Sequence, residues 1–358
     1  MKFEIRTNRE EEMRLQMTGF CQRRALITAL ICLLGIFPIC FYYHYYVHWT
    51  IDLSVFRVLN LPEKQRTVLN MTSIIADGAY TVSSSGRLGN QMGQYATLYA
   101  LAKLNRRPAY IRPQTYDYLS PFFKISLPIL DANVVEMIKW RTYGLHDWMS
   151  DEYKNLSGKY VFLAGYPCSW TFYHHLRDEI LREFTFNDFI REPANEYLEK
   201  LKHSRKNVTY IGVHVRRGDY LITMPNSWKG TVGDIGYLNK AMGYFRKKYQ
   251  EPVFVVTSNG MKWCKENIKN STGDVFFAGD GNESSPGRDL CLLVHCNHTI
   301  MTVGTFGFWA GYLAGGEVIY LDNFTLPNSR FLKIFHYDAA FLPEWIGIPA
   351  NLSTLTSL

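Results

Sequence analysis

A regular alternation of apolar strands with amphipathic helices over residues 210–321 limits the folds that this chain can adopt. The apolar runs predict strands at 210–215, 253–258, 274–278, 299–303 and 317–321, and the segments between them predict helices at 236–249, 260–268, 288–297 and 306–314. Apolar strands separated by helices are typical of a parallel sheet that is covered on both faces. Ligands of such sheets bind beyond the carboxyl ends of the strands, so a functional site is expected there.

The first of these strands ends in a charged sequence. It carries His214 and is followed by Arg216, Arg217, Gly218 and Asp219. Guanidinium groups bind phosphate oxygens two at a time, and a glycine lets the chain turn closely around a ligand. We therefore predict a phosphate-bearing ligand. One alternative is that these are solvated loop charges. Another is that Arg217-Gly218-Asp219 is an exposed adhesion tripeptide, which the preceding apolar strand disfavours.

Polar groups also follow the other strands, at 257–259, at 278–280 and at Gly304-Thr305-Phe306, which opens a helix. Earlier in the chain, a strand at 79–82, a loop that contains Gly86, Arg87 and Asn90, and a helix at 91–104 are expected, with a further strand at 109–111. Helix N-termini favour bound anions. The loop does not have the dinucleotide-binding glycine spacing, and simple turn chemistry is the alternative for it.

Asp289 lies near the start of predicted helix 288–297. A carboxylate there can accept the two donors of a guanine edge, although favourable charge at a helix N-terminus is the alternative role. No Asp-x-Asp sequence is present to hold a divalent ion on a diphosphate, and no Cys or His cluster has zinc spacing. We therefore predict that fixed arginines replace a metal ion and that no cofactor is needed.

The stretch 165–175 is rich in aromatic residues. Trp170, Tyr173 and His174 are candidates for binding a sugar, since aromatic faces stack on its apolar face and polar ring atoms bond its hydroxyls. An aromatic core segment that leads into a helix is the alternative. A zinc site at His174 and His175 is disfavoured, because neighbouring helical residues point in different directions.

The N-terminal region predicts a membrane anchor. Residues 25–43 form a run of 19 residues without a charge, and as a helix they would span roughly 28 Å. Most nearby Lys and Arg residues precede this run, which predicts a cytoplasmic N-terminus. We expect a tail at 1–24, a signal-anchor at 25–43 and a stem at 44–77. A cleaved signal peptide is the alternative, disfavoured by the length of the run and the aromatic residues after it.

The residues beyond the anchor are expected to face an oxidising, glycosylating compartment. Eight Asn-x-Ser/Thr sequons lie there, at Asn70, Asn155, Asn207, Asn270, Asn282, Asn297, Asn323 and Asn351. We expect use of Asn70, Asn155, Asn270 and Asn282, since Asn207, Asn297 and Asn323 adjoin predicted strands or core. One or two disulfides are possible among Cys168, Cys264, Cys291 and Cys296. The net charge of +7 is spread along the chain, so a nucleic-acid partner is not expected.

Three segments resemble the vertebrate galactoside alpha-1,2-fucosyltransferases. They are residues 86–93 (GRLGNQMG), 214–220 (HVRRGDY) and 304–307 (GTFG), within a similarity that covers about residues 78–350. The resemblance implies two Rossmann-like domains of the GT-B kind, a Golgi address and no metal. It also implies transfer of fucose from GDP-fucose, with inversion, to the 2-hydroxyl of a terminal beta-galactose on glycoproteins or glycolipids. The tail is longer and more acidic than is usual for the family, and the stem does not visibly match.

The resemblance also implies roles for particular residues. In more distant fucosyltransferases a His-x-Arg-Arg motif binds the donor diphosphate, which marks His214 and Arg216. Asp289 and Thr305 match the guanine-binding and phosphate-binding positions of that set. The full predicted donor site is Gly86, Arg87, Asn90, His214, Arg216, Arg217, Asp289, Thr305 and Phe306. We expect residues 78–200 to form an acceptor-side domain and residues 201–358 a GDP-fucose-binding domain.

The general base is left open by the sequence, with Asp219, His174 and His175 as candidates. We predict Arg216, His214 and Asp219 as catalytic residues. The alternative for Asp219 is that it only orients Arg216, since a dissociative transfer needs only a weak base. Three alternative functions remain at this point. They are a catalytically silent galactoside-binding lectin in the lumen, a fucosyltransferase of other linkage, and an adhesion protein.

Overall fold

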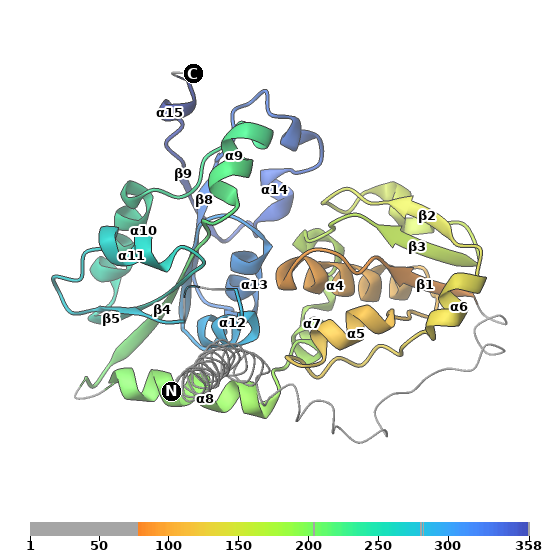
Figure 1. The fold of residues 1–358 in the computed structure, drawn as a ribbon, viewed down its shortest axis with the longest axis horizontal. Helices are drawn as coiled ribbons and strands as arrows, with labels where there is room; N and C mark the ends of the chain where they lie inside the picture. The colour runs from red at the N-terminus through yellow and green to blue at the C-terminus, as the bar shows by residue number, and fades with distance from the viewer. Residues whose placement is uncertain (1–77, 203–204, 280, 282, 357–358) are drawn as a thin grey trace, which may run out of the picture. The chain divides into compact units, whose positions relative to one another are not determined.

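The computed structural model describes residues 78–202, 205–279, 281 and 283–356, whose fold is shown in Figure 1. All of these residues belong to one compact unit, residues 66–358. The predicted tail, signal-anchor and stem lie outside the described residues, as do the sequons at Asn70 and Asn282. Among the helices that the structure describes, none is long and apolar enough to cross a bilayer.

A six-stranded sheet forms the larger layer. Its strands are β4 (Val208–Val215), β5 (Glu251–Ser258), β6 (Val275–Phe277), β7 (His298–Met301), β8 (Val318–Asp322) and β9 (Ile346–Pro349). Their order is β6-β5-β4-β7-β8-β9, and every neighbouring pair is parallel. The predicted parallel sheet is confirmed, and its five predicted strands agree with the structure to within two residues at each end. The sixth strand, β9, was not predicted.

Helices connect these strands by crossovers. They are α10 (Ile235–Lys248), α11 (Met261–Asn267), α12 (Pro286–Val294) and α13 (Thr305–Ala314). The side chain of Asp234 caps α10 by accepting a hydrogen bond from the backbone N–H of Tyr237, at 2.7 Å. Pro286 stands at the first position of α12, where a missing N–H is tolerated. Because crossovers between parallel strands are right-handed as a rule, this strand order puts α10 and α11 on one face of the sheet and α12 and α13 on the other (Figure 1).

The strands of this sheet are buried because helices cover both of its faces. Ile211, Val213 and Val215 of β4 are fully buried, as are residues 253–256 of β5. Helix α8 (Asp188–Lys202) packs against α12 and buries one residue per turn, at Ile190, Ala194, Leu198 and Leu201. This spacing of three or four residues makes one apolar face, and each buried aliphatic side chain contributes roughly 1.5–3 kcal/mol.

A smaller parallel sheet lies in the N-terminal half. Its order is β1-β3-β2, from β1 (Ala79–Val82), β3 (Tyr160–Ala164) and β2 (Arg141–Gly144). The predicted strand at 109–111 is present only as isolated bridges, from Ala109 to Tyr80 and from Ile111 to Ile129. The α/β class with parallel sheets is thus confirmed, whereas the division into two domains near residue 200 stays a prediction.

The remaining elements complete the two layers. The α-helices are α4 (Leu88–Leu104), α5 (Pro113–Leu119), α6 (Ala132–Met137), α7 (Arg177–Glu183), α9 (Tyr220–Trp228), α14 (Tyr337–Ala340) and α15 (Ser353–Thr356). The 3-10 helices are η2 (Asp151–Asn155), η3 (Trp170–Phe172), η4 (His174–Leu176) and η5 (Arg330–Lys333). Helix α4 begins three residues before its predicted start, so the loop residues Leu88 to Asn90 form its first turn.

The four cysteines of the described region are all buried and unpaired, namely Cys168, Cys264, Cys291 and Cys296. The disulfides that the sequence allowed among these four are therefore not formed. Burial raises the pKa of the Cys291 thiol to about 12, so this group is a small apolar side chain rather than a nucleophile. The thiols of these cysteines are therefore buried side chains, and none of them serves as a nucleophile.

Candidate active site

A polar cavity of about 450 Å³ opens beyond the carboxyl ends of β4 and β5. The strand order reverses between β4 and β7, because the chain moves from β4 to β5 and β6 before it returns to β7. Such a switch point is where parallel sheets bind ligands, since the loops on either side diverge there. The cavity is lined by Gly86, Arg87, Leu88, Gly89, Asn90, Tyr118, His214, Arg216, Asp219, Tyr220, Thr257, Ser258, Asn259, Glu283, Pro286, Asp289, Val303, Gly304, Thr305 and Phe306.

Arg216 is held firmly at the mouth of this cavity. Its backbone N–H donates to Oγ1 of Thr302 at 2.9 Å, and its guanidinium carbon lies 4.8 Å from the ring centre of Tyr220. Nη2 donates to Oδ1 of Asp219 at 2.6 Å, and Nη1 donates to Glu283. The side chain is only 13% exposed, so two of its donors have fixed directions. This is the arrangement that two-point binding of an oxyanion requires.

A second guanidinium shares the same acids. Arg87, at the N-terminal boundary of α4, forms an ion pair with Glu283, and its Nη2 lies 3.8 Å from Oδ2 of Asp219. Glu283 thus contacts the arginines of two distant segments, and its Oε1 also accepts from Nδ2 of Asn259 at 3.2 Å. The sequence did not point to Glu283, because the Gly, Asn and Ser residues around it do not indicate which side chains it will contact.

Arg217 points away from the cavity. Its guanidinium carbon lies 3.8 Å from the ring centre of Trp263, and burial lowers its pKa. Its backbone N–H donates to Oδ1 of Asn259 at 2.7 Å. The next residue, Gly218, has φ of +52°, and a Cβ there would lie 2.4 Å from Nδ2 of Asn259. Of the nine predicted donor residues, Arg217 is the one that does not line the cavity. With Arg217 stacked and Asp219 paired, the tripeptide is not presented for adhesion.

His214 supplies a neutral, buried imidazole. Burial, and secondly the charge of Arg216, lower its pKa to about 3, so the ring is uncharged at neutral pH. The ring packs against Phe306 with centres 4.8 Å apart. Nδ1 of His214 and Oγ1 of Thr257 have no hydrogen-bond partner among the described residues. A buried polar atom without a partner costs about 1–3 kcal/mol, and both residues line the cavity, which favours a bound ligand there.

Two helix N-termini meet at the cavity. Oγ1 of Thr305, the first residue of α13, donates to Oδ1 of Asn90 in the first turn of α4, at 2.8 Å. The indole N–H of Trp309 donates to the carbonyl of Gly89 at 3.0 Å. A Cβ on Gly89 would lie 2.6 Å from the backbone nitrogen of Phe306, so only glycine allows this approach. The unpaired amides and dipoles of both helices favour an anion between them.

Asp289 lies in the first turn of α12 and lines the same cavity. Gly279 packs directly against its carboxylate, since a Cβ on Gly279 would lie 2.9 Å from Oδ1 of Asp289. Gly279 also has φ of +81°, a conformation that favours glycine. The structure therefore brings Asp289 together with Arg216 and Thr305, as the sequence predicted.

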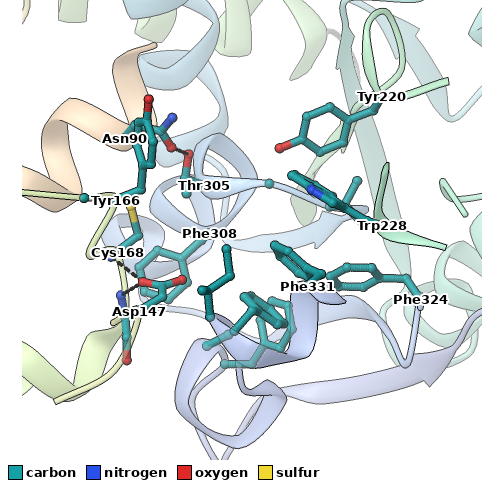
Figure 2. A pocket seen from close by; sticks show the side chains of 18 of the residues that line it. Asn90, Asp147, Tyr166, Cys168, Tyr220, Trp228, Thr305, Phe308, Phe324 and Phe331 are labelled. Carbon is teal, nitrogen blue, oxygen red and sulfur yellow. Dashed lines mark hydrogen bonds between the residues drawn. The ribbon is translucent and has the colours of Figure 1, made fainter. Parts of the chain in front are cut away.

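An aromatic cavity of about 520 Å³ adjoins the polar one (Figure 2). The two share Asn90, Tyr220, Val303, Gly304 and Thr305 as a common wall. Aromatic rings supply half of the remaining lining residues, and the rings of Trp228 and Phe331 stack with centres 4.4 Å apart. Tyr166, Phe308, Phe324, Phe335 and Phe341 are the other aromatic residues of this part.

The predicted acceptor residues lie outside both cavities. Tyr173 is fully buried, stacks on Trp309 with centres 5.3 Å apart, and donates its hydroxyl to the carbonyl of Cys168. Nε1 of Trp170 donates to the carbonyl of Phe341 at 3.0 Å, and Nδ1 of His174 lies 3.3 Å from the hydroxyl of Tyr312. This packing is that of an aromatic core segment, the alternative interpretation. A sugar cannot reach Tyr173, so its assignment to the acceptor is not supported.

The family match and the most similar known proteins agree with each other. The family described as Glycosyl transferase family 11 matches residues 52–349. Galactoside alpha-(1,2)-fucosyltransferase 2 of Sus scrofa is 60% identical over 279 residues, which are 78% of this chain and 82% of that protein. Galactoside alpha-(1,2)-fucosyltransferase 1 of Rattus norvegicus is 59% identical over 284 residues, 78% of this chain and 76% of that one.

Solved structures are more distant. The crystal structure of NodZ alpha-1,6-fucosyltransferase soaked with GDP-fucose is 15% identical, with a TM-score of 0.48, and the match covers 69% of this chain and 95% of that one.

Proposed function

Because the chain belongs to glycosyl transferase family 11, among the galactoside alpha-1,2-fucosyltransferases, we propose that it transfers L-fucose from GDP-β-L-fucose to the 2-hydroxyl of a terminal β-galactose. The bond between the fucose anomeric carbon and the diphosphate oxygen breaks, and a bond from the galactose oxygen forms on the opposite face. The observation that carries the proposal is the position of Arg216, which lines the polar cavity together with Thr305 of α13 and is held through its backbone by Thr302.

The polar cavity accounts for the donor. Arg216 and Arg87 neutralise the diphosphate, and the N-termini of α4 and α13 supply amides to its remaining oxygens. Charge develops on the diphosphate as GDP leaves, and preorganised donors stabilise it without rearrangement in the transition state. The carboxylate of Asp289 accepts the two donors of the guanine edge. His214, being neutral, provides a hydrogen bond to the donor rather than charge.

The aromatic cavity accounts for the acceptor. The apolar face of galactose stacks on aromatic side chains, and Trp228 and Phe331 offer such a surface. The common wall of the two cavities, which includes Thr305 and Asn90, brings the acceptor hydroxyl close to the donor sugar. In this assignment, Trp228 and Phe331 of the acceptor surface lie within residues 201–358, and both cavities also take residues from the N-terminal half.

The test is release of GDP from GDP-fucose by the purified chain, with and without a β-galactoside. Release that requires the galactoside, with a fucosylated product whose linkage is alpha-1,2, supports the proposal. Galactoside binding without turnover would instead identify a lectin. Product with another linkage would identify a fucosyltransferase of different regiochemistry.

Glu283 competes with the donor for both arginines, which gives a prediction. Glu283→Gln removes the negative charge but keeps an acceptor oxygen, so GDP should bind several-fold more tightly, as measured by calorimetry. Glu266→Gln is the matched control, because Glu266 is an exposed acid on α11, 3.9 Å from Lys262. Weaker GDP binding by Glu283→Gln alone would show that Glu283 orients the arginines for the donor instead.

We propose that the reaction needs no metal ion. The chain has no Asp-x-Asp sequence, and no group of three or more His, Cys, Asp or Glu side chains suited to a metal occurs within the described residues. Treatment with EDTA is therefore expected to leave the initial rate nearly unchanged, measured before and after addition of Mn²⁺ or Mg²⁺. Loss of activity that Mn²⁺ restores would refute metal independence.

We also propose a Golgi membrane location with type II topology, because most nearby Lys and Arg residues precede the apolar run 25–43. The sequons at Asn155 and Asn270 are exposed, as glycosylation of a lumenal body requires. Protease added to sealed Golgi vesicles should then remove only a short N-terminal piece, and glycosidase should lower the mass of the protected body. A protected N-terminus would reverse the orientation.

A further inference from the structure

One carboxylate lines the aromatic cavity, that of Asp147. Its Oδ1 accepts two backbone hydrogen bonds, from the N–H groups of Cys168 at 2.5 Å and Ser169 at 3.0 Å. Figure 2 shows both bonds. Both donors meet the same oxygen, so these two bonds leave Oδ2 unengaged on a residue that lines the cavity. Asp147 follows β2 in a loop without periodicity, so sequence analysis did not single it out.

No cation pairs with Asp147 among the described residues. Burial raises its pKa to about 7, although the two backbone hydrogen bonds act in the opposite direction. Asp147 is half-buried and has no ion-pair partner, so its two backbone hydrogen bonds hold the carboxylate without neutralising its charge. A hydrogen-bonded acid in a cavity whose pKa lies near neutrality is suited to proton transfer.

The peptide segment that holds Asp147 packs closely against α4. A Cβ on Gly93 of α4 would lie 2.4 Å from Sγ of Cys168, so the turn at 166–169 lies directly on that helix. The carbonyl of Pro167 accepts from Oγ1 of Thr97 at 3.2 Å. The same helix carries Asn90, which borders both cavities. The carboxylate is therefore held in position relative to the donor side of the common wall.

We infer that Asp147 is the general base of the transfer, an assignment that rests on the proposed function. As the acceptor oxygen forms its bond to the fucose anomeric carbon, its proton passes to Oδ2 of Asp147. The electron pair of the broken bond leaves with GDP, whose charge Arg216 neutralises. Asp147 is thus a catalytic residue that contacts the acceptor hydroxyl.

The other candidates for the base are less well placed. Asp219 pairs with Arg216 and approaches Arg87, so its oxygens serve the donor side. His174 lies outside both cavities and beside Tyr312. His175 likewise lines neither cavity. Asp147 is the one carboxylate on the acceptor side of the wall, among the residues described.

The assignment predicts a pH dependence. A base acts in its deprotonated form, so turnover should rise with pH through about 7, the pKa of Asp147. The titratable groups around it are the Cys168 thiol and the Tyr173 hydroxyl, with Tyr166 and Tyr220 also on the cavity wall. Burial raises the pKa of both Cys168 and Tyr173, which therefore stay neutral over this range. His146 and His336 stack on the adjoining Trp148.

The experiment compares Asp147→Asn with wild-type enzyme from pH 5.5 to 9. Asparagine keeps an Oδ1 acceptor for the two amides but cannot take a proton. We expect kcat to fall by about a hundredfold or more and the acid limb to disappear, while GDP affinity is unchanged. Asp151→Asn is the matched control, since Asp151 is an exposed acid 2.6 Å from Lys154, and it should retain the wild-type profile.

Three results would overturn the assignment. The first is an Asp147→Asn enzyme that keeps a near wild-type kcat and the same acid limb. The second is an Asp147→Asn enzyme whose GDP affinity and thermal midpoint fall in proportion to its rate. The third, and last, is a wild-type kcat that does not change through pH 7. The last needs no variant, so it stands even if Asp147→Asn does not fold. A wild-type enzyme that transfers no fucose to any β-galactoside would instead refute the proposed function itself.

Discussion

Arg216→Lys is expected to lower turnover by about a hundredfold or more while the fold persists. Two different nitrogens of Arg216 contact two different acids, Asp219 and Glu283, and one ammonium group cannot span both directions. The backbone bond to Thr302 does not involve the side chain, so the strand end should keep its position. The measurements are kcat for fucosyl transfer and the inhibition constant of GDP.

Arg217→Lys provides the comparison. Its guanidinium stacks on Trp263 outside the cavity, so this substitution should cost far less activity and mainly lower thermal stability. Near-normal transfer by Arg216→Lys, with unchanged GDP inhibition, would mean that the strand end is structural. The donor site would then have to lie elsewhere.

Gly89→Ala is expected to disrupt both the donor cavity and the fold around it. A Cβ at this position would lie 2.6 Å from the carbonyl carbon of Thr305 and from the nitrogen of Phe306. These are backbone atoms that cannot rotate away, so α4 and α13 must separate at the point where their first turns line the site. Overpacking of this kind costs about 1–3 kcal/mol of unfolding free energy. The thermal midpoint and GDP affinity should both fall.

Gly243→Ala is the control for this effect. Gly243 lies in α10, and an added Cβ there would have nothing within 4 Å. Alanine is the better helix former, so the thermal midpoint should stay the same or rise slightly, with unchanged GDP binding. If Gly89→Ala behaved like Gly243→Ala, the close packing of α4 on α13 would not be needed for donor binding.

The sequence alone predicted the parallel sheet and most of the donor cavity, for a local reason. Strand and helix periodicities are properties of neighbouring residues, and the carboxyl ends of parallel strands must lie at one edge. His214, Arg216 and Thr305 follow from that rule without knowledge of any long-range contact. Gly86, Arg87 and Asn90 followed from the glycine loop before α4, and the structure brings them to the same cavity.

Groups whose position depends on distant segments were missed. Glu283 meets Arg87 across 196 positions of the chain, and nothing local to either residue indicates that contact. The aromatic cavity combines α9 and α13 with residues 145–169 and 324–341, four segments that lie far apart in the chain. Trp170, Tyr173 and His174 had a sugar-binding composition, yet tertiary packing placed Tyr173 and His174 against α13 and Trp170 against Phe341. A large aromatic cluster gains more from burial than from exposure.

The sequence by itself thus determined the α/β class, the edge of the sheet at which the site lies, and the chemistry of the phosphate-binding side chains. These depend on residue type and short-range periodicity. Only the tertiary structure decided which arginine faces the cavity, which acids neutralise it and where the acceptor side lies. Each of these depends on contacts between segments far apart in the chain, which sequence periodicity does not specify. Asp147 is the clearest case, because its surroundings are set by backbone amides some 20 residues away.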